Sequence, residues 1–265
     1  MCRPGEEVRT GVTTEDPFSL AGRRAVVTGG NRGIGAAIVL ALARAGADVV
    51  SVHRSAEEPS VAAQMRALGR SYAVVRADLA QVDELPAIAE RILAQCGPID
   101  ILVNNAGLII RRPAAEVPLH EWRLLLDTDL TAAFVLCQAF GRPMLKRQSG
   151  AIVNIASVLS FQGGINVPAY AVAKSGLAGL TRALANEWAG KGVNVNAVAP
   201  GYIATDQTAP LRADPVRSEQ ISVRIPAGRW GRPEDVAGAV VFLCSPAAAW
   251  VHGHVLVVDG GWLSR

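Results

Sequence analysis

Short apolar runs rich in β-branched residues alternate along the chain with longer segments of helical periodicity. Runs such as DVVSV, ILV and AIVNI are apolar at successive positions, as expected of parallel strands covered by helices on both faces. Strands are predicted at 25–28, 48–53, 71–76, 99–103, 151–155, 193–198 and 254–258, and helices at 33–45, 59–68, 82–95, 119–146, 168–189 and 233–243. This order predicts an α/β fold, a single-domain Rossmann-type doubly wound parallel sheet of about seven strands.

Length and composition agree with one domain. The chain has 265 residues, of which 50% are hydrophobic and 18% charged, enough apolar surface for a large core. Residues 1–19 are polar and are predicted to be a flexible tail before one catalytic domain at 20–265. A long stretch near 200–232 breaks the alternation, and its part at 202–228 is predicted to be an irregular functional lid. The opening residues lack the apolar segment of a secretory signal, so a cytoplasmic location is expected.

Several classes of protein are not favoured by the sequence. No run approaches the ~20 apolar residues that span a bilayer, and the net charge of +3 is spread out rather than gathered in a nucleic-acid-binding stripe. We therefore expect neither a membrane nor a nucleic-acid partner. His252 and His254 are spaced for one face of a strand but have no third ligand nearby, so no metal is predicted. His53 and His120 are expected at the surface.

A glycine-rich segment, TGGNRGIG at 28–35, directly follows the first predicted strand and opens the first helix. Glycines at such a junction permit a tight turn, and the N-terminus of the helix offers unpaired N–H groups to phosphates. The segment therefore predicts a dinucleotide-phosphate site. Its predicted contacts are Gly29, Asn31, Arg32, Gly33, Ile34 and Gly35.

The TGxxxGxG spacing resembles the short-chain dehydrogenase/reductase family, and other motifs of that family follow in order from about Leu20 to the C-terminus. They are an ADL motif after the third strand, an NNAG turn after the fourth and a PG turn after the sixth. The resemblance implies that ADL meets the adenine, NNAG lines the cofactor and PG lies near the nicotinamide. The implied contacts are Asp78, Leu79, Asn105, Ala106, Gly107, Pro200, Gly201, Ile203 and Thr205.

The end of the second strand should decide between the two nicotinamide cofactors. An acidic residue there repels the 2′-phosphate of NADP(H), whereas arginine attracts it. The strand is followed by Arg54, with no carboxylate before Glu57, and Arg32 lies in the glycine-rich segment. These two guanidinium groups favour NADP(H). NAD(H) stays open, because the branch of the family that the chain most resembles is commonly NAD-linked.

Tyr170 and Lys174 stand four residues apart, and so on one face of the helix predicted at 168–189. A free phenol titrates near ~10, and a neighbouring ammonium group is expected to lower that pKa. Ser157 follows the fifth strand and can donate a hydrogen bond to a substrate oxygen. The resemblance implies that Tyr170 is the acid/base, that Ser157 binds the substrate and that Lys174 also binds the nicotinamide ribose.

One position departs from the family pattern. The family has an asparagine in its central helix that helps to hold a proton-relay water near the lysine. Here the sequence reads DTDL at 127–130, so Asp129 stands at that position of the catalytic set. A backbone carbonyl can preserve the relay, or Asp129 can stabilise a charged lysine. The first alternative leaves the pH optimum unchanged and the second shifts it.

Longer strings, among them NNAGLIIRR and IASVLSFQGGINVPAYAVAKSG, resemble a branch of the family that acts on keto-deoxy sugar acids. Such a small-molecule substrate carries one carboxylate, which a bidentate arginine can orient. The predicted substrate contacts are Ser157, Gln162, Tyr170 and Arg111. Further candidates are Arg112, Asn166, Tyr202, Arg212 and Arg217.

Two other functions remain open. A 3-oxoacyl-carrier-protein reductase would need a basic docking patch and an acyl channel, and a non-catalytic dinucleotide-binding regulator would bind cofactor without turnover. The intact set Ser157, Tyr170 and Lys174 favours an enzyme over the regulator. The family is usually tetrameric, and the closing run VDGGWL resembles its interface segment, so a homotetramer is expected.

Overall fold

The computed structural model describes residues 16–55 and 59–265 and confirms the predicted fold. Its single sheet has seven strands in the order β3-β2-β1-β4-β5-β6-β7, and neighbouring strands are parallel. The strands are β1 Arg24–Thr28, β2 Asp48–His53, β3 Tyr72–Arg76, β4 Ile101–Asn104, β5 Gly150–Ile155, β6 Val193–Pro200 and β7 Val255–Val258. Each predicted strand is present, with ends that differ by no more than two residues.

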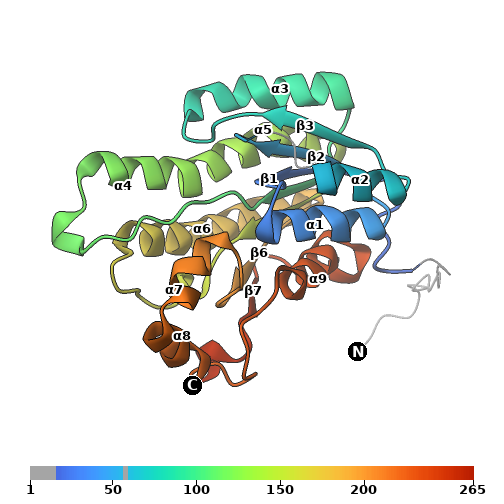
Figure 1. Cartoon of the computed structure of the whole chain (residues 1–265). Coiled ribbons are helices and arrows are strands. Elements are labelled where there is room, and N and C mark those ends of the chain that lie inside the picture. Colours follow the sequence, from blue (N-terminus) through green and yellow to red (C-terminus); the bar gives the residue numbers. More distant parts are fainter. Residues whose placement is uncertain (1–15, 56–58) are drawn as a thin grey trace, which may run out of the picture.

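Helices cover both faces of the sheet, which explains the continuous apolar runs of the strands. The helices are α1 Gly33–Arg44, α2 Pro59–Ala67, α3 Leu85–Cys96, α4 Leu119–Leu126, α5 Ala132–Arg147, α6 Pro168–Trp188, α7 Ala209–Ala213, α8 Pro215–Ser222 and α9 Pro233–Cys244. Buried side chains of α1, α2 and α9 form the core on one face, and those of α3, α5 and α6 form the core on the other. Figure 1 shows α1 beside α9, with α3 and α5 across the sheet.

The prediction that the segment 202–228 is irregular is wrong, because the segment contains the two short helices α7 and α8. Each has a proline in its first turn, where a missing N–H costs nothing, and the Asp214 side chain accepts a 3.0 Å hydrogen bond from Arg217 N at the start of α8. Ile221 and Ile225 pack with Trp262 near the C-terminus. The segment is therefore a packed flap beside the carboxyl ends of the strands (Figure 1).

Residues 1–15 of the predicted tail lie outside the described residues, and residues 16–19 contact the domain. The carbonyl of Pro17 accepts a hydrogen bond from Ala247 N at 3.0 Å, and the ring of Phe18 lies 6.4 Å from that of Phe242 in α9. Leu20, which begins the predicted domain, is buried.

The predicted helix at 119–146 is continuous, but it includes the π-helical turn Asp127–Thr131 between α4 and α5. By length and composition, Leu119–Arg147 is apolar enough to cross a bilayer. In the folded chain it packs against α3 and α6, as core helices do, and 44% of its most apolar window is buried inside the protein.

Candidate active site

The predicted site residues gather at the carboxyl end of the sheet, where β1 lies between β2 and β4. The strand order reverses direction at β1, and open α/β sheets bind ligands in the crevice at such a point. The glycine-rich loop follows β1, and the NNAG turn follows β4. The two loops therefore form opposite sides of one crevice.

The NNAG turn holds the glycine-rich loop in place. Asn105 Nδ2 donates to the carbonyl oxygens of Thr28 at 2.8 Å and Gly29 at 3.2 Å. Thr28 Oγ1 accepts hydrogen bonds from the backbone nitrogens of Asn105 and Ala106, each at 3.0 Å. The Asn105 amide, predicted as a cofactor contact, is thus used to position the loop that the cofactor phosphates would meet.

The glycine-rich loop fits a dinucleotide pyrophosphate. A Cβ atom at Gly35 would overlap the carbonyl oxygen of Gly29, so helix α1 can approach the loop this closely only with glycine there. No side chain caps the N-terminus of α1, and no acidic residue lies in its first turn. The unpaired backbone N–H groups in the first turn of α1 thus face the crevice with a partial positive charge, as a phosphate requires.

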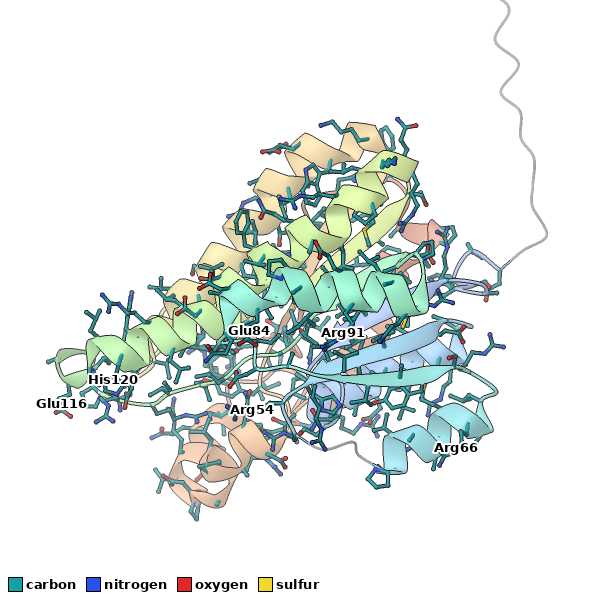
Figure 2. All side chains as sticks on the ribbon, turned by 90° about the horizontal axis from the view of Figure 1, so that it is seen from above. Arg54, Arg66, Glu84, Arg91, Glu116 and His120 are labelled. Atoms are coloured by element: carbon teal, nitrogen blue, oxygen red, sulfur yellow. The ribbon has the colours of Figure 1, made fainter. Side chains whose placement is uncertain are left out.

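At the adenine end, Arg54 lies 3.7 Å from Asp78, measured from Nη1 to Oδ2. Both residues line a depression of about 310 Å³, which Arg76, Ala77, Glu84, Ile88 and Arg91 complete. Figure 2 shows Arg54, Glu84 and Arg91 around this end, with Arg66 away from it. Leu79 is buried beside Asp78, and Glu57 lies outside the described residues.

The expectation that His53 lies at the surface is wrong. Its side chain is buried, because β2 is an inner strand of a sheet whose faces are covered by helices. His120 is exposed, as expected. In the part of the chain that the structure describes, no three His, Cys, Asp or Glu side chains gather as a metal site would require.

The segment after β6 crosses to the glycine-rich loop. Gly201 N donates to Val258 O at 3.0 Å, and Ile203 is buried in a β-bridge with Gly231. The Thr205 methyl group lies 3.5 Å from the position of a Cβ at Gly33. Pro200, Gly201, Ile203 and Thr205 therefore lead from the sheet edge to the predicted phosphate site.

Asp206 and Gln207, which follow Thr205, bridge the crevice. The sequence did not reveal these contacts. Gln207 Nε2 donates to Gly107 O at 2.9 Å, and Arg111 Nη2 donates to Gln207 O at 3.1 Å. Asp206 Oδ2 lies 3.3 Å from Arg32 Nη1 in the glycine-rich loop. No local pattern could have indicated these contacts, since about a hundred or more residues separate the partners.

The predicted catalytic side chains meet beside this bridge. Ser157 begins the 3₁₀ turn Val158–Ser160, and its Oγ accepts a hydrogen bond from Leu159 N at 3.1 Å. Lys174 Nζ is buried, donates to Ile155 O at 3.1 Å and lies 5.4 Å from the ring centre of Tyr170. The Ser157 hydroxyl acts on the Tyr170 phenol and lowers its pKa. A serine, a phenol and an ammonium group thus converge where a carbonyl oxygen can meet all three.

Asp129 lies in the π-helical turn and completes this group. Its Oδ2 is 3.3 Å from Lys174 Nζ, and its Oδ1 accepts a hydrogen bond from Leu108 N at 2.8 Å. The carboxylate is fully buried. Of the two alternatives from the sequence, the geometry therefore matches an aspartate paired with a charged lysine.

Comparisons with known proteins agree with this geometry. A family model described as enoyl-(acyl carrier protein) reductase matches residues 29–263. A 2-dehydro-3-deoxy-D-gluconate 5-dehydrogenase from Pseudoalteromonas atlantica is 50% identical over 94% of this chain and 99% of its own. The chain belongs to the short-chain dehydrogenase/reductase family. It is therefore an oxidoreductase that acts on a carbonyl or a secondary alcohol.

Two solved structures of this family are similar over their full length. One is a putative NAD(P)-dependent gluconate 5-dehydrogenase from Beutenbergia cavernae with bound NADP, 55% identical, with a TM-score of 0.92 over 94% of this chain and 100% of that chain. The other is a putative 2-deoxy-D-gluconate 3-dehydrogenase from Agrobacterium tumefaciens with bound NADP, 50% identical, with a TM-score of 0.89 over 95% of this chain and 100% of that chain.

The expectation that Lys174 lowers the pKa of the catalytic phenol of this dehydrogenase/reductase is confirmed, but two other effects oppose it. Burial raises the pKa of Tyr170, and the charge of Asp129 raises it further, so together they outweigh Lys174, Ser157 and Arg111, which lower it. Burial alone would lower the pKa of Lys174, but Asp129 and Tyr170 outweigh it and raise that pKa. The unliganded protein therefore holds a protonated phenol beside a charged ammonium group.

The substrate candidates separate clearly. Arg112 donates two hydrogen bonds to Glu121, at 2.9 and 2.7 Å, and is therefore a structural residue. Arg111 is exposed, and its charge acts on Tyr170. Tyr202 packs against Trp230 and Trp262 in the flap core.

The remaining candidates lie on loops and on the flap. Gln162 is half-buried in the loop after Ser157, and Asn166 O accepts a hydrogen bond from Arg112 N at 2.8 Å. Arg212 donates to Thr205 O at 3.1 Å, and Arg217 donates to Gln220 Oε1 at 3.1 Å within α8.

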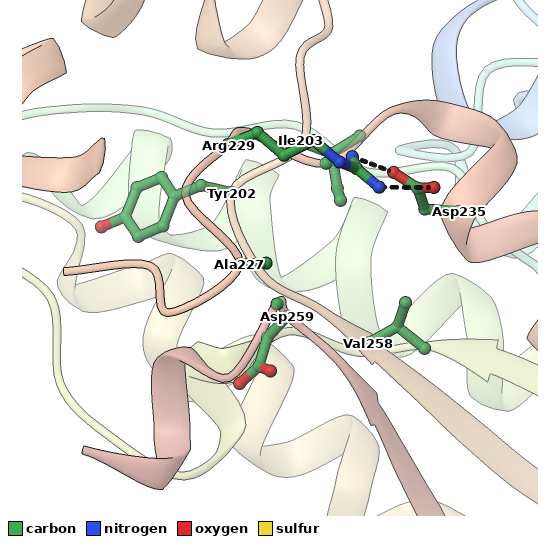
Figure 3. A pocket seen from close by; sticks show the side chains of 9 residues that line it. Tyr202, Ile203, Ala227, Arg229, Asp235, Val258 and Asp259 are labelled. Carbon is green, nitrogen blue, oxygen red and sulfur yellow. Dashed lines mark hydrogen bonds and ion pairs between the residues drawn. The ribbon is translucent and has the colours of Figure 1, made fainter. Parts of the chain in front are cut away.

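A second depression, of about 210 Å³, lies at the base of the flap. It is lined by Tyr202, Ile203, Ala227, Arg229, Gly231, Asp235, Val258, Asp259 and Gly260. Figure 3 shows Arg229 paired with Asp235 on one side and Asp259 on the other. None of the four predicted catalytic residues lines it, so it adjoins the reaction centre without forming part of it.

Proposed function

We propose that this oxidoreductase transfers a hydride between NADP(H) and a ketone or secondary alcohol of a keto-deoxy sugar acid. The observation that carries the proposal is the position of Arg111 on the loop that follows the NNAG turn, where its guanidinium donates a hydrogen bond to Gln207 O in the bridge across the crevice. A cation at this crevice suits a substrate that carries a carboxylate as well as a reacting carbonyl. The name of the relative from Pseudoalteromonas atlantica supports the same substrate class.

The residues of the chain supply the proton chemistry. When bound, the nicotinamide supplies or accepts the hydride. In carbonyl reduction Tyr170 donates its proton to the developing alkoxide, and in alcohol oxidation it accepts that proton. Ser157 is fixed by Leu159 N and donates a hydrogen bond to the substrate oxygen. Lys174, held by Ile155 O, keeps a positive charge beside the phenol.

The preference for NADP(H) is supported by Arg54, which lines the depression at the adenine end, and by Arg32 in the glycine-rich loop. The Arg54 side chain is 82% exposed and its contact with Asp78 is long, so it can turn to a 2′-phosphate at little cost. The two solved relatives that carry bound NADP support the same preference. NAD(H) is the alternative, and the affinity comparison below separates the two.

A substrate panel tests the function. The full-length protein is assayed by the absorbance of the reduced nicotinamide, with NADPH and NADH, against keto-deoxy sugar acids, their uncharged carboxamides and 3-oxoacyl thioesters. We expect turnover of a sugar acid with NADPH and at least roughly tenfold lower kcat/KM for its carboxamide, because a charge-assisted hydrogen bond contributes about 1.5–3 kcal/mol. Activity on thioesters alone would identify an acyl-carrier-protein reductase, and stoichiometric NADPH binding without any turnover would identify a regulator.

We also propose a homotetramer in the cytoplasm, with the segment 202–228 as the substrate lid. Exposed apolar side chains support assembly: Trp250 is 95% exposed near the edge strand β7, and Phe134 and Val172 are exposed on α5 and α6. Light scattering after size-exclusion chromatography measures the assembly. A monomer at micromolar concentration would exclude it.

A further inference from the structure

The carboxylate of Asp129 is buried against the catalytic ammonium group with little else to bind it. Its side chain is 0% exposed, and Oδ2 has no hydrogen-bond partner apart from the ion pair with Lys174. Gly107 makes this approach possible, because a Cβ there would lie 2.7 Å from Oδ2. Burial raises the pKa of Asp129, and the Lys174 ammonium group and Leu108 N oppose that rise, so the negative charge of this carboxylate depends on its pairing with Lys174.

The charges that face Tyr170 come from its own helix and from two other parts of the fold. Lys174 lies one turn along α6, Asp129 lies on the π-helical turn, and Arg111 lies on the loop after the NNAG turn, while the uncharged Ser157 hydroxyl approaches from the end of β5. Without Asp129, the neighbours of the phenol would be two cations and one hydroxyl, all of which favour the phenolate. Asp129 is the single described carboxylate in that set, and it opposes them.

We propose that Asp129 is a positioning residue whose negative charge offsets the positive charge of the Lys174 ammonium group. It thereby keeps Tyr170 protonated, so that the unliganded site is poised to donate a proton to a carbonyl. The proposal concerns which side of the reaction the site favours at neutral pH. A protonated phenol is the form that carbonyl reduction consumes, and alcohol oxidation must wait for its ionisation. Compared with a site that lacks this carboxylate, this site should therefore keep its rate of carbonyl reduction to a higher pH. Its rate of alcohol oxidation should begin to rise only at a higher pH.

Ultraviolet titration of the unliganded protein tests this directly, because tyrosinate absorbs where tyrosine does not. The chain has three tyrosines, so the titration has three ionisation steps. The step that is missing in Tyr170→Phe belongs to Tyr170. In the wild type the Tyr170 step should lie above the ~10 of a free phenol, and in Asp129→Asn it should move to lower pH. Asp127→Asn is the matched control, since it removes a carboxylate from the same helical turn that forms no ion pair with Lys174.

Each outcome decides the proposal. A Tyr170 step below that of a free phenol in the wild type, or an unmoved step in Asp129→Asn, overturns it; an equal shift in Asp127→Asn overturns it as well. Thermal melting checks that each variant is folded. If Asp129→Asn does not fold, Asp129→Ser provides a second uncharged side chain, and the wild-type step still decides.

A kinetic experiment adds to the titration and rests on the proposed function. For alcohol oxidation, the pH at which kcat rises should be lower in Asp129→Asn than in the wild type, whereas a merely structural role would lower kcat without moving that pH. If the protein does not turn over the proposed substrate, only this kinetic experiment is lost, because the titration needs neither substrate nor cofactor. The two failures are therefore distinguishable.

Discussion

Arg32 in the glycine-rich loop and Asp206 in the flap form an ion pair, with 3.3 Å between Nη1 and Oδ2. The side chains are 71% and 79% exposed, and an ion pair in water contributes at most about 1 kcal/mol. Beside it, Gln207 bridges to Gly107 through a single 2.9 Å hydrogen bond. The flap is therefore joined to both loops of the cofactor crevice by a few exposed polar contacts, which suits the role of a lid proposed for it.

Asp206→Asn should tighten NADPH binding. Arg32 is a predicted contact of the 2′-phosphate, and Asp206 competes with that phosphate for it. Because the ion pair is exposed, we expect an affinity gain of up to about fivefold at low salt, which shrinks as salt is added. Tryptophan fluorescence titrations with NADPH and NADH measure it, with the exposed flap residue Glu219→Gln as control. A similar gain for NADH would contradict the competition.

Arg54→Ala should weaken NADPH binding and leave NADH binding almost unchanged. Loss of one charge-assisted hydrogen bond to a phosphate corresponds to an affinity decrease of roughly tenfold or more. Arg66→Ala is the matched control, because Arg66 is exposed on α2 and does not line the adenine-end depression. Equal losses for the two cofactors would show that Arg54 does not read the 2′-phosphate.

Tyr170→Phe should keep its dinucleotide affinity and lose its turnover. The phenol supplies the proton, and removal of a general acid–base group typically costs about 10²–10⁴ in rate. Fluorescence titration with NADPH checks that the crevice is intact, and the absorbance assay measures kcat. A variant that still turns over at the wild-type rate would refute the assignment of the proton donor.

Arg111→Gln and Arg112→Gln should have different effects, although the residues are adjacent. Arg111→Gln should raise KM for a sugar acid by roughly tenfold, with no effect on its carboxamide, because only the charged substrate loses an ion pair. Arg112→Gln should instead lower the melting temperature, since it breaks the bidentate contact with Glu121. The reverse pattern would assign the carboxylate site to Arg112.

Asp235 should stabilise the fold in a pH-dependent way. Its hydrogen bond from Arg229 lowers its pKa from 3.8 to about 2, and it also accepts a hydrogen bond from Arg232 N at the start of α9. A lowered pKa stabilises the folded state above pH 3.8, and that stabilisation is lost as the pH falls toward about 2. Asp235→Asn should therefore cost about 1 kcal/mol at neutral pH, and urea titrations near pH 3 should show a smaller difference. A constant difference would exclude the charge effect.

The fold was predictable because its signals are local. Each strand is a short apolar run, because a parallel strand is covered by helices on both faces. These runs alone located the seven strands to within two residues. The flap was less predictable. Helices α7 and α8 are short and depend on the packing of Ile221 and Ile225 against Trp262, far along the chain.

The position of His53 shows the same limit. A histidine at the end of a strand before an arginine resembles a surface residue, but β2 is an inner strand and segments distant in the sequence pack over the sheet. Burial depends on those segments, and the sequence of β2 does not reveal them.

The order of the loops at the sheet edge and the pairing of Tyr170 with Lys174 can be read from the sequence, because helical periodicity places residues four apart on one face. The direction in which the pKa of each partner shifts depends on the packed fold. Burial of the phenol, together with the charge of Asp129, which reaches Lys174 from another helix, outweighs the lowering effect of Lys174 on the pKa of Tyr170. Electrostatic effects depend on distance and on burial, which are fixed only when distant segments pack together.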